Sequence, residues 1–589
     1  MRSHYLKSDA ATDSSSHSSI NKLPFFDDTK ARLNPVEVSA PFQVTYSVQE
    51  WLLNLMHDPN YKNEKIKQAL ETIEHTPEYF SHLVNSFHCV PLEPISETSR
   101  FKDELWHAWP FNLYSQLFLK NKQWLTQAFK KLPGANQHQL NIINFIMIQC
   151  LECASPANFL MTNPLMIKQT IMKGGNNLRN GYANLVDDVY RLFLKLPPKG
   201  AEKFKVGCNV AVTKGSVVMR NELMELLQYH PTTRKVKAQP ILIIPAWIMK
   251  YYILDLSPEN SLIKYLVDQG FTVFTISWKN PTSSDRSLGM EDFLNLGILS
   301  SIDCIHKIIK NQLVHTVGYC LGGTLLSMAT AKLAKDKKKR IASMSLLAAQ
   351  TDFSEPGDIG IFIDKYQIKL IESLMRSSGF MDSAQMSGAF QLIGAADRKW
   401  SQITKEYLLG ERSELNDLMA WNADGTRLPC HMHSEYLNHM YLNNDLAMGN
   451  YKIDSKPISL GDIEEPTFAI GMKQDFVAPW KSVYKLHHYL HGDLEFVLGS
   501  GGHNAGIVNP PNSDHTGSFQ HLLRTKGDTT LSPDAWLKKA NVEQGSWWPF
   551  WVNWLDNHSS GEVDAPKLTA SSAPKNHCVE AAPGTYVLQ

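Results

Sequence analysis

A cysteine flanked by glycines stands where a predicted strand passes into a predicted helix. The segment Gly318-Tyr-Cys-Leu-Gly-Gly323 follows the apolar run Val314–Val317 and precedes an apolar helix-forming run that begins at Thr324. Such a strand-to-helix turn is a nucleophile elbow, where strained backbone at the nucleophile leaves little room for side chains on its neighbours. The positive end of the following helix favours a thiolate. The pattern predicts nucleophilic attack by Cys320 on an acyl carbon.

Two further residues follow later strands in the order that such a site requires. Asp475 lies four residues beyond the predicted strand Thr467–Gly471, and His503 lies in a glycine-rich loop after the predicted strand Leu494–Leu498. Nucleophile, acid and histidine succeed one another in this order in α/β-hydrolases. Either residue alone could be an ordinary turn or loop residue. Together, at successive strand ends, they predict a catalytic triad with Cys320.

Two backbone N–H groups are candidates for binding an oxyanion. The N–H of Leu321 stands at the start of the helix that follows the nucleophile, where it can donate to an oxyanion. The second donor is expected in the loop after the early strand Ile241–Ile244. Pro245 has no N–H, so Ala246 and Trp247 are the candidates, and Trp247 is favoured.

The elements that must position these residues are short apolar strands alternating with helices. Two small strands are predicted at Lys205–Thr213 and Ser216–Arg220, and helices at Leu262–Gln269 and Met290–Gln312. Six buried strands are predicted: Ile241–Ile244, Phe271–Trp278, Val314–Gly318, Ala342–Ala349, Thr467–Gly471 and Leu494–Leu498. This alternation indicates a mostly parallel sheet covered by helices. With the elbow, it predicts an α/β-hydrolase fold.

The chain is long enough for several structural units. Residues 1–45 are polar and Ser-rich, which predicts a disordered tail. Residues 46–203 have a mainly helical pattern and form a predicted N-terminal domain, and residues 204–589 form the predicted catalytic domain. About 100 residues, 351–456, carry no predicted sheet strand and fall between the nucleophile and the acid. We expect this insertion to be a helical cap; an extra helical layer is the alternative.

Composition and charge exclude several classes of protein. The 58 basic and 58 acidic residues balance, so nothing indicates nucleic acid as a partner. The eight cysteines are scattered, the N-terminal segment lacks the apolar core of a secretory signal, and no apolar run reaches the roughly 18 residues that span a bilayer. A cytoplasmic location is therefore expected.

No metal or cofactor is predicted. Cys150 and Cys153 form a single CxxC in an apolar, helix-like run, where core packing is the favoured interpretation because one pair cannot complete a zinc site. His487 and His491 are four residues apart, but no third ligand stands at the spacing that a metalloprotease requires.

Segments along most of the chain, from about residue 90 to 589, carry a resemblance to one family. They are Ser155-Pro-Ala-Asn-Phe-Leu-Met-Thr-Asn-Pro, Val206-Gly-Cys-Asn-Val-Ala, Gln228-Tyr-His-Pro-Thr-Thr, Ile244-Pro-Ala-Trp-Ile-Met-Lys-Tyr-Tyr-Ile-Leu-Asp-Leu, Gly318-Tyr-Cys-Leu-Gly-Gly-Thr, Trp421-Asn-Ala-Asp-Gly-Thr and Gly545-Ser-Trp-Trp. The chain thereby resembles the class I polyhydroxyalkanoate synthases, which form poly-3-hydroxybutyrate. Trp247 and Met249 depart from the smaller or polar residues expected in their loop, which weakens the assignment of the oxyanion contact.

The resemblance implies an acyltransferase that polymerises (R)-3-hydroxyacyl-CoA, with 3-hydroxybutyryl-CoA as the expected substrate, and that releases CoA. It implies no cofactor beyond that substrate, a homodimer that contacts through the cap, and association with polyester granules and their proteins. His503 would take the proton of Cys320, and Asp475 would orient His503 or activate the 3-hydroxyl of the acyl group.

Two other functions stay open at this point. A thioesterase or lipase-like hydrolase could use the same triad, because fold and triad do not determine which acceptor takes the acyl group. A non-enzymatic granule-coating protein is the third hypothesis, and the intact triad argues against it.

Overall fold

The computed structural model describes residues 100–129, 136–310, 312–392, 396–511, 517–566 and 580–589. All of them fall within one unit of the chain, Val38–Gln589. The predicted tail, residues 1–45, lies outside the described residues. So do residues 46–99 of the predicted N-terminal domain.

The described part of the N-terminal region is helical, as predicted. Its main helices are α4 (Phe111–Phe129), α5 (Gln137–Cys153), α6 (Pro164–Met172) and α7 (Asn176–Phe193). Local sequence determines where they begin. Asn136 and Gln139 form a capping box before α5, and Asn163 caps α6 ahead of a proline in its first turn.

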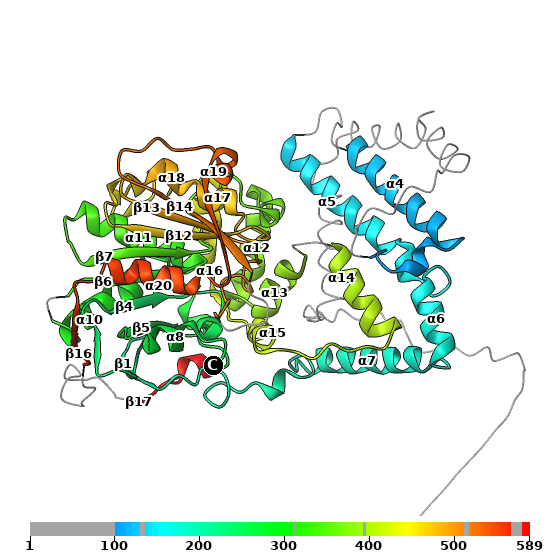
Figure 1. The fold of residues 1–589 in the computed structure, drawn as a ribbon, viewed down its shortest axis with the longest axis horizontal. Coiled ribbons are helices and arrows are strands. Elements are labelled where there is room, and N and C mark those ends of the chain that lie inside the picture. The colour runs from blue at the N-terminus through cyan, green and yellow to red at the C-terminus, as the bar shows by residue number, and fades with distance from the viewer. Residues whose placement is uncertain (1–99, 130–135, 311, 393–395, 512–516, 567–579) are drawn as a thin grey trace, which may run out of the picture. The chain divides into compact units, whose positions relative to one another are not determined.

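Eleven strands of the described chain form one sheet, in the order β15-β14-β13-β12-β7-β6-β4-β5-β2-β1-β17. The six central strands are parallel: β4 (Ile241–Ile244), β5 (Val273–Trp278), β6 (Val314–Tyr319), β7 (Ile341–Leu347), β12 (Thr467–Met472) and β13 (Leu494–Gly499). Helices cover this part of the sheet (Figure 1), so its strands are nearly continuous apolar runs. The predicted positions of these six strands are confirmed within a few residues.

The outer strands are antiparallel and complete the sheet. They are β1 (Gly215–Arg220), β2 (Met224–Tyr229), β14 (Ser518–Arg524), β15 (Asn541–Gln544) and β17 (Glu580–Ala581). The predicted strand at Lys205–Thr213 is wrong. This segment turns back on itself at Gly207, which has a φ of 79° and whose N–H donates to the carbonyl of Val210. Strand β1 pairs instead with β2 on one side and with β17 on the other.

Helices α8 (Leu262–Asp268), α11 (Leu321–Lys335) and α20 (Trp548–Asn557) accompany the sheet, with the shorter α17 (Trp480–Tyr484), α18 (Leu486–Tyr489) and α19 (Pro533–Lys539). The predicted helix from Met290 runs through α9 (Met290–Asp292), a π-helical segment, Phe293–Leu299, and α10 (Ser300–Ile308). Gly297 lies in the π-helical segment, and a Cβ there would come 2.5 Å from the Trp278 ring. The glycine therefore allows this helix to pack closely on β5.

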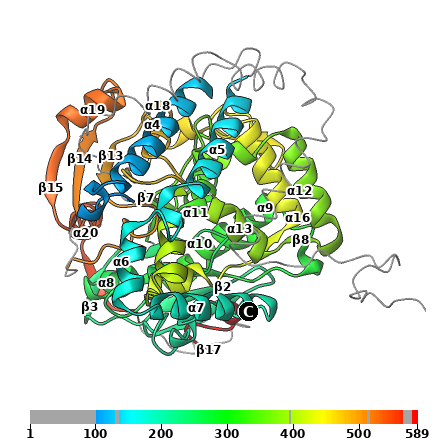
Figure 2. The same ribbon diagram turned by 90° about the vertical axis from the view of Figure 1, so that its right-hand side faces the viewer.

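Residues 351–456 form the insertion between β7 and β12, and none of its described strands joins the main sheet. Its helices are α12 (Lys365–Ser378), α13 (Ser383–Leu392), α14 (Ala396–Ile403), α15 (Asp417–Asn422) and α16 (Cys430–Tyr436), with π-helical segments at Thr404–Leu408 and Leu437–Leu442. Two small sheets accompany them: β8 (Phe380–Met381) with β9 (Leu428–Pro429), and β10 (Lys452–Ile453) with β11 (Lys456–Pro457). Helices α12 and α16 pack side by side (Figure 2).

The insertion also contacts the N-terminal helices. On α7, a Cβ at Gly181 would lie 1.9 Å from the carbonyl oxygen of Tyr407, so only glycine permits this approach. Asn177 donates to the carbonyl of Leu408 at 3.0 Å.

A separate ribbon pairs β3 (Lys235–Lys237) with β16 (Glu562–Asp564). Among the described residues, no helix is both long enough and apolar enough to cross a bilayer.

Candidate active site

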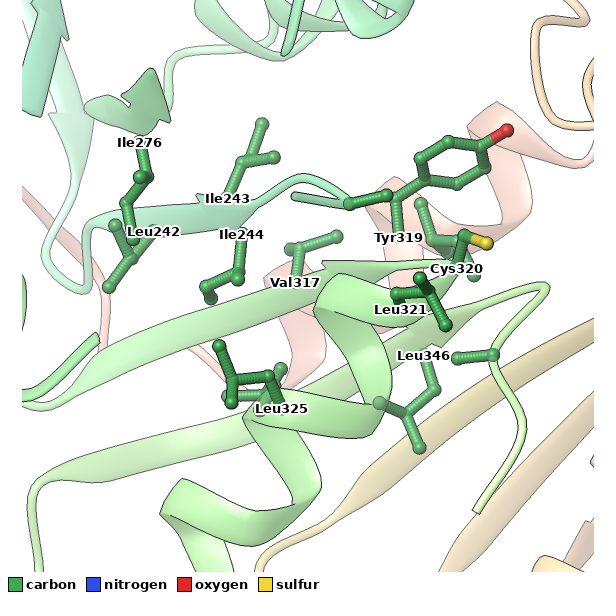
Figure 3. Packing of buried hydrophobic residues seen from close by; sticks show 14 of the residues in the cluster. Leu242, Ile243, Ile244, Ile276, Val317, Tyr319, Cys320, Leu321, Leu325 and Leu346 are labelled. Carbon is green, nitrogen blue, oxygen red and sulfur yellow. The ribbon is translucent and has the colours of Figure 1, made fainter. Parts of the chain in front are cut away.

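Cys320 occupies the turn between β6 and α11 in a strained backbone conformation, with φ 52° and ψ −124°. Such a conformation costs about 1–3 kcal/mol and persists only where the surroundings enforce it. The neighbouring glycines make it sterically feasible. A Cβ at Gly318 would lie 2.3 Å from the Cα of Gly323, and one at Gly322 would lie 2.1 Å from the carbonyl oxygen of Ile244. The geometry is that of the predicted elbow (Figure 3).

The backbone of Cys320 is held on both sides of the strained turn. Its N–H donates to the carbonyl of Leu347 on β7 at 2.9 Å, and its carbonyl accepts from the N–H of Gly323 at 2.9 Å. The residue is 9% exposed. These two bonds fix the backbone that carries the thiol, between the end of a buried strand and the start of a helix.

Asp475 and His503 lie in contact at the ends of adjacent strands β12 and β13. The Nδ1–H of His503 donates to Oδ2 of Asp475 at 2.6 Å. Oδ1 of the same carboxylate accepts from the N–H groups of Val477 and Ala478, both at 2.8 Å. Both oxygens are therefore engaged, and the Asp475 side chain is fully buried.

The surroundings of His503 determine its charge. Burial lowers the pKa of this imidazole, but the charges of Asp475 and Cys320, with hydrogen bonds to both, outweigh burial and raise the pKa well above its ordinary value. The protonated imidazole is consequently favoured between a carboxylate and the Cys320 sulfur. The structure thus brings the three residues of the predicted triad together.

Backbone hydrogen bonds fix the loops that carry the acid and the histidine to one another. The N–H of Lys473 donates to the carbonyl of Gly499 at 2.8 Å, and that of Gln474 donates to the carbonyl of Gly501 at 3.0 Å. These bonds continue the pairing of β12 and β13 beyond the ends of the strands. Asp475 and His503 therefore emerge side by side.

The two predicted oxyanion donors lie on two segments that contact each other, the start of α11 and the loop after β4. Leu321 is the first residue of α11, and Trp247 lies in the loop after β4. This loop abuts α11, because a Cβ at Gly322 would also come 2.6 Å from the carbonyl oxygen of Pro245. The contact between loop and helix is the arrangement that two converging N–H donors require, and their convergence on an acyl oxygen remains a prediction.

The Trp247 side chain is buried at the boundary between the sheet and the insertion. Its ring centroid lies 5.5 Å from that of Tyr436, perpendicular to it, and 6.3 Å from that of Phe293. Its indole nitrogen has no hydrogen-bond partner within the described structure. The large residue that the sequence placed in this loop therefore contacts the insertion.

Two tyrosines of the insertion were missed by sequence reasoning. The Tyr436 hydroxyl lies 3.2 Å from that of Tyr441. Burial raises the pKa of both tyrosines, and the charge of Cys320 contributes to the increase. Their side chains therefore lie close to the candidate nucleophile. Their aromatic character was visible in the sequence, but nothing local to them indicated the distance to Cys320.

The pairs considered for a metal do not form a site. His487 donates to the carbonyl of Tyr484 at 2.9 Å, while His491 lies beyond the end of α18 and contacts the carbonyl of Gly461 at 3.0 Å. Cys150 and Cys153 are exposed, so the prediction that they pack in a core is wrong. They lie in the last turn of α5 and face away from its packed side. Over the ranges that the structure covers, no group of three or more His, Cys, Asp or Glu side chains is arranged for a metal.

Comparison with family models first supports the fold class. Residues 239–380 match the family model described as alpha/beta hydrolase fold. Among solved structures, the Paleococcus ferrophilus monoacylglycerol lipase aligns with a TM-score of 0.32 at 11% identity, covering 57% of this chain and 99% of the lipase. Mouse alpha/beta hydrolase domain-containing protein 10 aligns with a TM-score of 0.29 at 14% identity, covering 50% and 93%. The strand order and the family model define a protein of the α/β-hydrolase fold.

Comparison at the level of sequence is more specific. Residues 97–266 match the model of the poly-beta-hydroxybutyrate polymerase (PhaC) N-terminus. A poly(3-hydroxyalkanoate) polymerase of Methylorubrum extorquens is 38% identical over 499 residues, which is 84% of this chain and 81% of the relative. The poly(3-hydroxyalkanoate) polymerase subunits PhaC of Rhizobium etli and Cupriavidus necator are 36% and 34% identical, covering 85% and 83% of this chain and 78% and 82% of theirs.

The chain belongs to the poly(3-hydroxyalkanoate) polymerase family and is an acyltransferase. The family predicted from the sequence segments is confirmed. Because the family consists of enzymes, the hypothesis of a non-enzymatic coating protein is not retained.

Proposed function

We propose that this enzyme polymerises (R)-3-hydroxyacyl-CoA, with 3-hydroxybutyryl-CoA as its substrate, into polyhydroxyalkanoate and releases CoA. The growing chain is carried as a thioester on Cys320. The observation that carries this proposal is the hydrogen bond between His503 and Asp475 at 2.6 Å, in a site where the charge of Cys320 also raises the pKa of His503. Membership of the family supports the acyl donor and the polymeric product.

The chemistry follows from the positions of these groups. The Cys320 sulfur attacks the thioester carbonyl, and the oxyanion that forms is stabilised by the N–H groups of Leu321 and Trp247. The C–S bond to CoA then breaks, and the His503 imidazolium gives its proton to the departing thiolate. The 3-hydroxyl oxygen of an incoming 3-hydroxyacyl-CoA then attacks the carbonyl of the Cys320 thioester, and His503 accepts the hydroxyl proton. The C–S bond to Cys320 breaks and its thiolate is regenerated. This thiolate attacks the CoA thioester of the lengthened chain, which returns the chain to Cys320. Each cycle adds one ester bond and releases one CoA.

The surroundings of Asp475 support one of the two roles left open by the sequence. Both carboxylate oxygens already accept hydrogen bonds, from His503 and from the N–H groups of Val477 and Ala478. No solvent-exposed surface of the side chain is left for a substrate hydroxyl to approach. We therefore assign Asp475 to orienting His503 and stabilising its protonated form, and assign activation of the 3-hydroxyl to His503.

The insertion supports the exclusion of water. Tyr436 and Tyr441 approach Cys320, and Phe353 packs on both, with ring centroids 6.1 Å and 4.9 Å away. Water that reached an acylated Cys320 would end the polymer, because hydrolysis releases the chain as a free acid. An apolar cover over the thioester favours transfer to a 3-hydroxyl instead.

We also propose that the enzyme forms a homodimer through the insertion and binds the surface of polyester granules. Two exposed apolar surfaces support these proposals. Tyr366, Leu370 and Leu374 form an exposed apolar stripe along α12 of the insertion, where a homodimer could bury it. Tyr182, Val186 and Tyr190 form a second exposed stripe on α7, where it suits the surface of a polyester granule. Cross-linking and size-exclusion chromatography of wild type and of L370E/L374E test the dimer. Co-sedimentation with polyester particles tests the second stripe.

The decisive experiment distinguishes polymerisation from hydrolysis. Purified enzyme with (R)-3-hydroxybutyryl-CoA should release CoA and form an insoluble polyester in matched amounts. CoA release accompanied only by soluble 3-hydroxybutyrate would establish a hydrolase instead. C320A should abolish CoA release while the thermal unfolding midpoint stays near that of wild type. Acyl-CoAs of increasing chain length then define the substrate range.

A further inference from the structure

The segment Gly545–Trp548 contacts the loop that carries His503. Three consecutive side chains donate to three carbonyls of that loop. The Trp547 indole donates to the carbonyl of Gly506 at 3.0 Å, and the Trp548 indole donates to that of Ile507 at 2.9 Å. The hydroxyl of Ser546 donates to the carbonyl of Asn509. We call Ser546, Trp547 and Trp548 the Ser-Trp-Trp clamp.

The clamp is part of a rigid scaffold. Trp547 and Trp548 are each 1% exposed. The Trp547 ring is nearly parallel to that of Phe468 on β12, at 6.3 Å between centroids. One turn along α20, the Trp551 indole donates to the hydroxyl of Ser345 on β7 at 3.0 Å. The clamp therefore fixes the position of the His503 loop relative to the central sheet.

The loop is held from its other side as well. The hydroxyl of Tyr319, which immediately precedes Cys320, donates to Oδ1 of Asn504 at 2.6 Å. Within the loop, a Cβ at Gly501 would lie 2.6 Å from the Cα of Gly506. Because the two glycines are in close contact, a displacement of Gly506 moves the residues that precede His503.

We propose that the Ser-Trp-Trp clamp positions His503 for proton exchange with Cys320, and that the indole N–H groups of Trp547 and Trp548 are the positioning contacts. This inference rests on the function proposed above for His503. The two indoles bind carbonyls of the loop backbone. They act through the backbone of the loop, which they fix three and four residues beyond the imidazole.

The effect on rate follows from the sensitivity of proton transfer to distance. A proton moves efficiently only between atoms within hydrogen-bond distance, and a displacement of about 1 Å can lower a rate by about 100-fold. Phenylalanine in place of either tryptophan keeps most of the buried aromatic surface and removes the N–H donor. The loop carbonyl then loses its partner, and the loop gains freedom at that residue.

The test compares W547F, W548F and the double variant with W551F. The last is a matched control, because Trp551 lies on the same helix, is equally buried and donates through its indole to Ser345 rather than to the loop. The first readout is alkylation of Cys320 by iodoacetamide between pH 6 and 9.5, followed by peptide mass spectrometry. The exposed Cys150 serves as an internal reference. The second is kcat and KM for CoA release from (R)-3-hydroxybutyryl-CoA.

We expect the double variant to alkylate Cys320 about 10-fold more slowly than W551F at pH 6.5, with the difference closing above pH 9. At high pH a thiol ionises without help from an imidazolium. We expect kcat to fall about 10- to 100-fold with KM within about 2-fold. Equal alkylation profiles in the double variant and W551F would overturn the proposal. So would a loss of kcat that simply follows a loss of thermal stability in all variants.

Alkylation requires no substrate, so this test is independent of the proposed function. A wild-type enzyme that forms no polymer would contradict the function, while its alkylation profile would still report on the clamp. Conversely, polymer formation that is unaffected in the double variant would contradict the clamp and leave the polymerase proposal in place.

Discussion

The Nδ1–H of His503 donates to Oδ2 of Asp475 at 2.6 Å, and the second oxygen of that carboxylate is bound by two backbone N–H groups. The acid is thereby held in a single orientation by its own loop, and the imidazole is held by the acid. The charges of Asp475 and of Cys320 both raise the pKa of His503.

Replacing Asp475 by Asn should slow CoA release and shift its dependence on pH. The amide keeps the shape of the side chain but removes the charge that raises the pKa of His503. We expect kcat to fall between about 100-fold and 10,000-fold. The imidazolium would lose its proton at lower pH, so the alkaline limb of the pH profile of kcat should move to lower pH. An unchanged alkaline limb in D475N would contradict the assigned role.

The elbow glycine Gly322 should tolerate no side chain. A Cβ there would lie 2.1 Å from the carbonyl oxygen of Ile244, which is backbone and cannot rotate away. We expect G322A to lower the free energy of unfolding by about 3 kcal/mol or more, measured by urea denaturation. G425A is the control, because a Cβ at Gly425 meets nothing closer than 3.3 Å. Equal stabilities of the two variants would contradict this account of the elbow.

The buried Asp255 should make stability depend on pH. Burial raises the pKa of its carboxyl from 3.8 to about 6, although Thr213 and Ser261 donate to it. The carboxyl has a higher pKa in the folded state than in the unfolded state, so the folded protein resists its ionisation. The free energy of unfolding therefore decreases as the pH rises from the unfolded pKa to the folded pKa. Relative to D255N, the free energy of unfolding of wild type should therefore decrease by about 2 kcal/mol between pH 4.5 and pH 7.5.

Urea denaturation of both proteins at the two pH values measures that difference. The stability difference should level off above pH 7.5, where the carboxyl is ionised in both states. A difference between wild type and D255N that did not change with pH would show that Asp255 is ionised in the fold throughout this range.

Glu225 should hold the C-terminal segment on the sheet. Its fully buried carboxylate accepts from the N–H groups of Thr585 and Tyr586 and from Arg220. E225A should lower the free energy of unfolding by about 2–3 kcal/mol, because it leaves these donors without their acceptor. Limited proteolysis should then cleave within residues 580–589 faster than in wild type. E562Q, at an exposed glutamate, should match wild type.

Sequence reasoning succeeded where the signal was local. The six central strands are continuous apolar runs. The elbow combines a strand, glycines and a helix within about 20 residues, and over such a short span the periodicity and the steric constraints can be recognised in the sequence. The strand β2 was missed because Glu225 and Gln228 interrupt its apolar pattern. Both side chains are buried, and the Glu225 carboxylate accepts a hydrogen bond from Thr585, which lies 360 residues further along the chain.

The sequence by itself determined the order of nucleophile, acid and histidine and the strand end at which each stands. Only the tertiary structure decided that Asp475 and His503 are bonded, that Tyr436 and Tyr441 approach Cys320, and that Trp547 and Trp548 hold the His503 loop. The physical reason is that periodicity and turn chemistry act between neighbours along the chain. Distances between loops instead depend on how the strands pair and how the helices pack against them, and no short stretch of sequence records that packing.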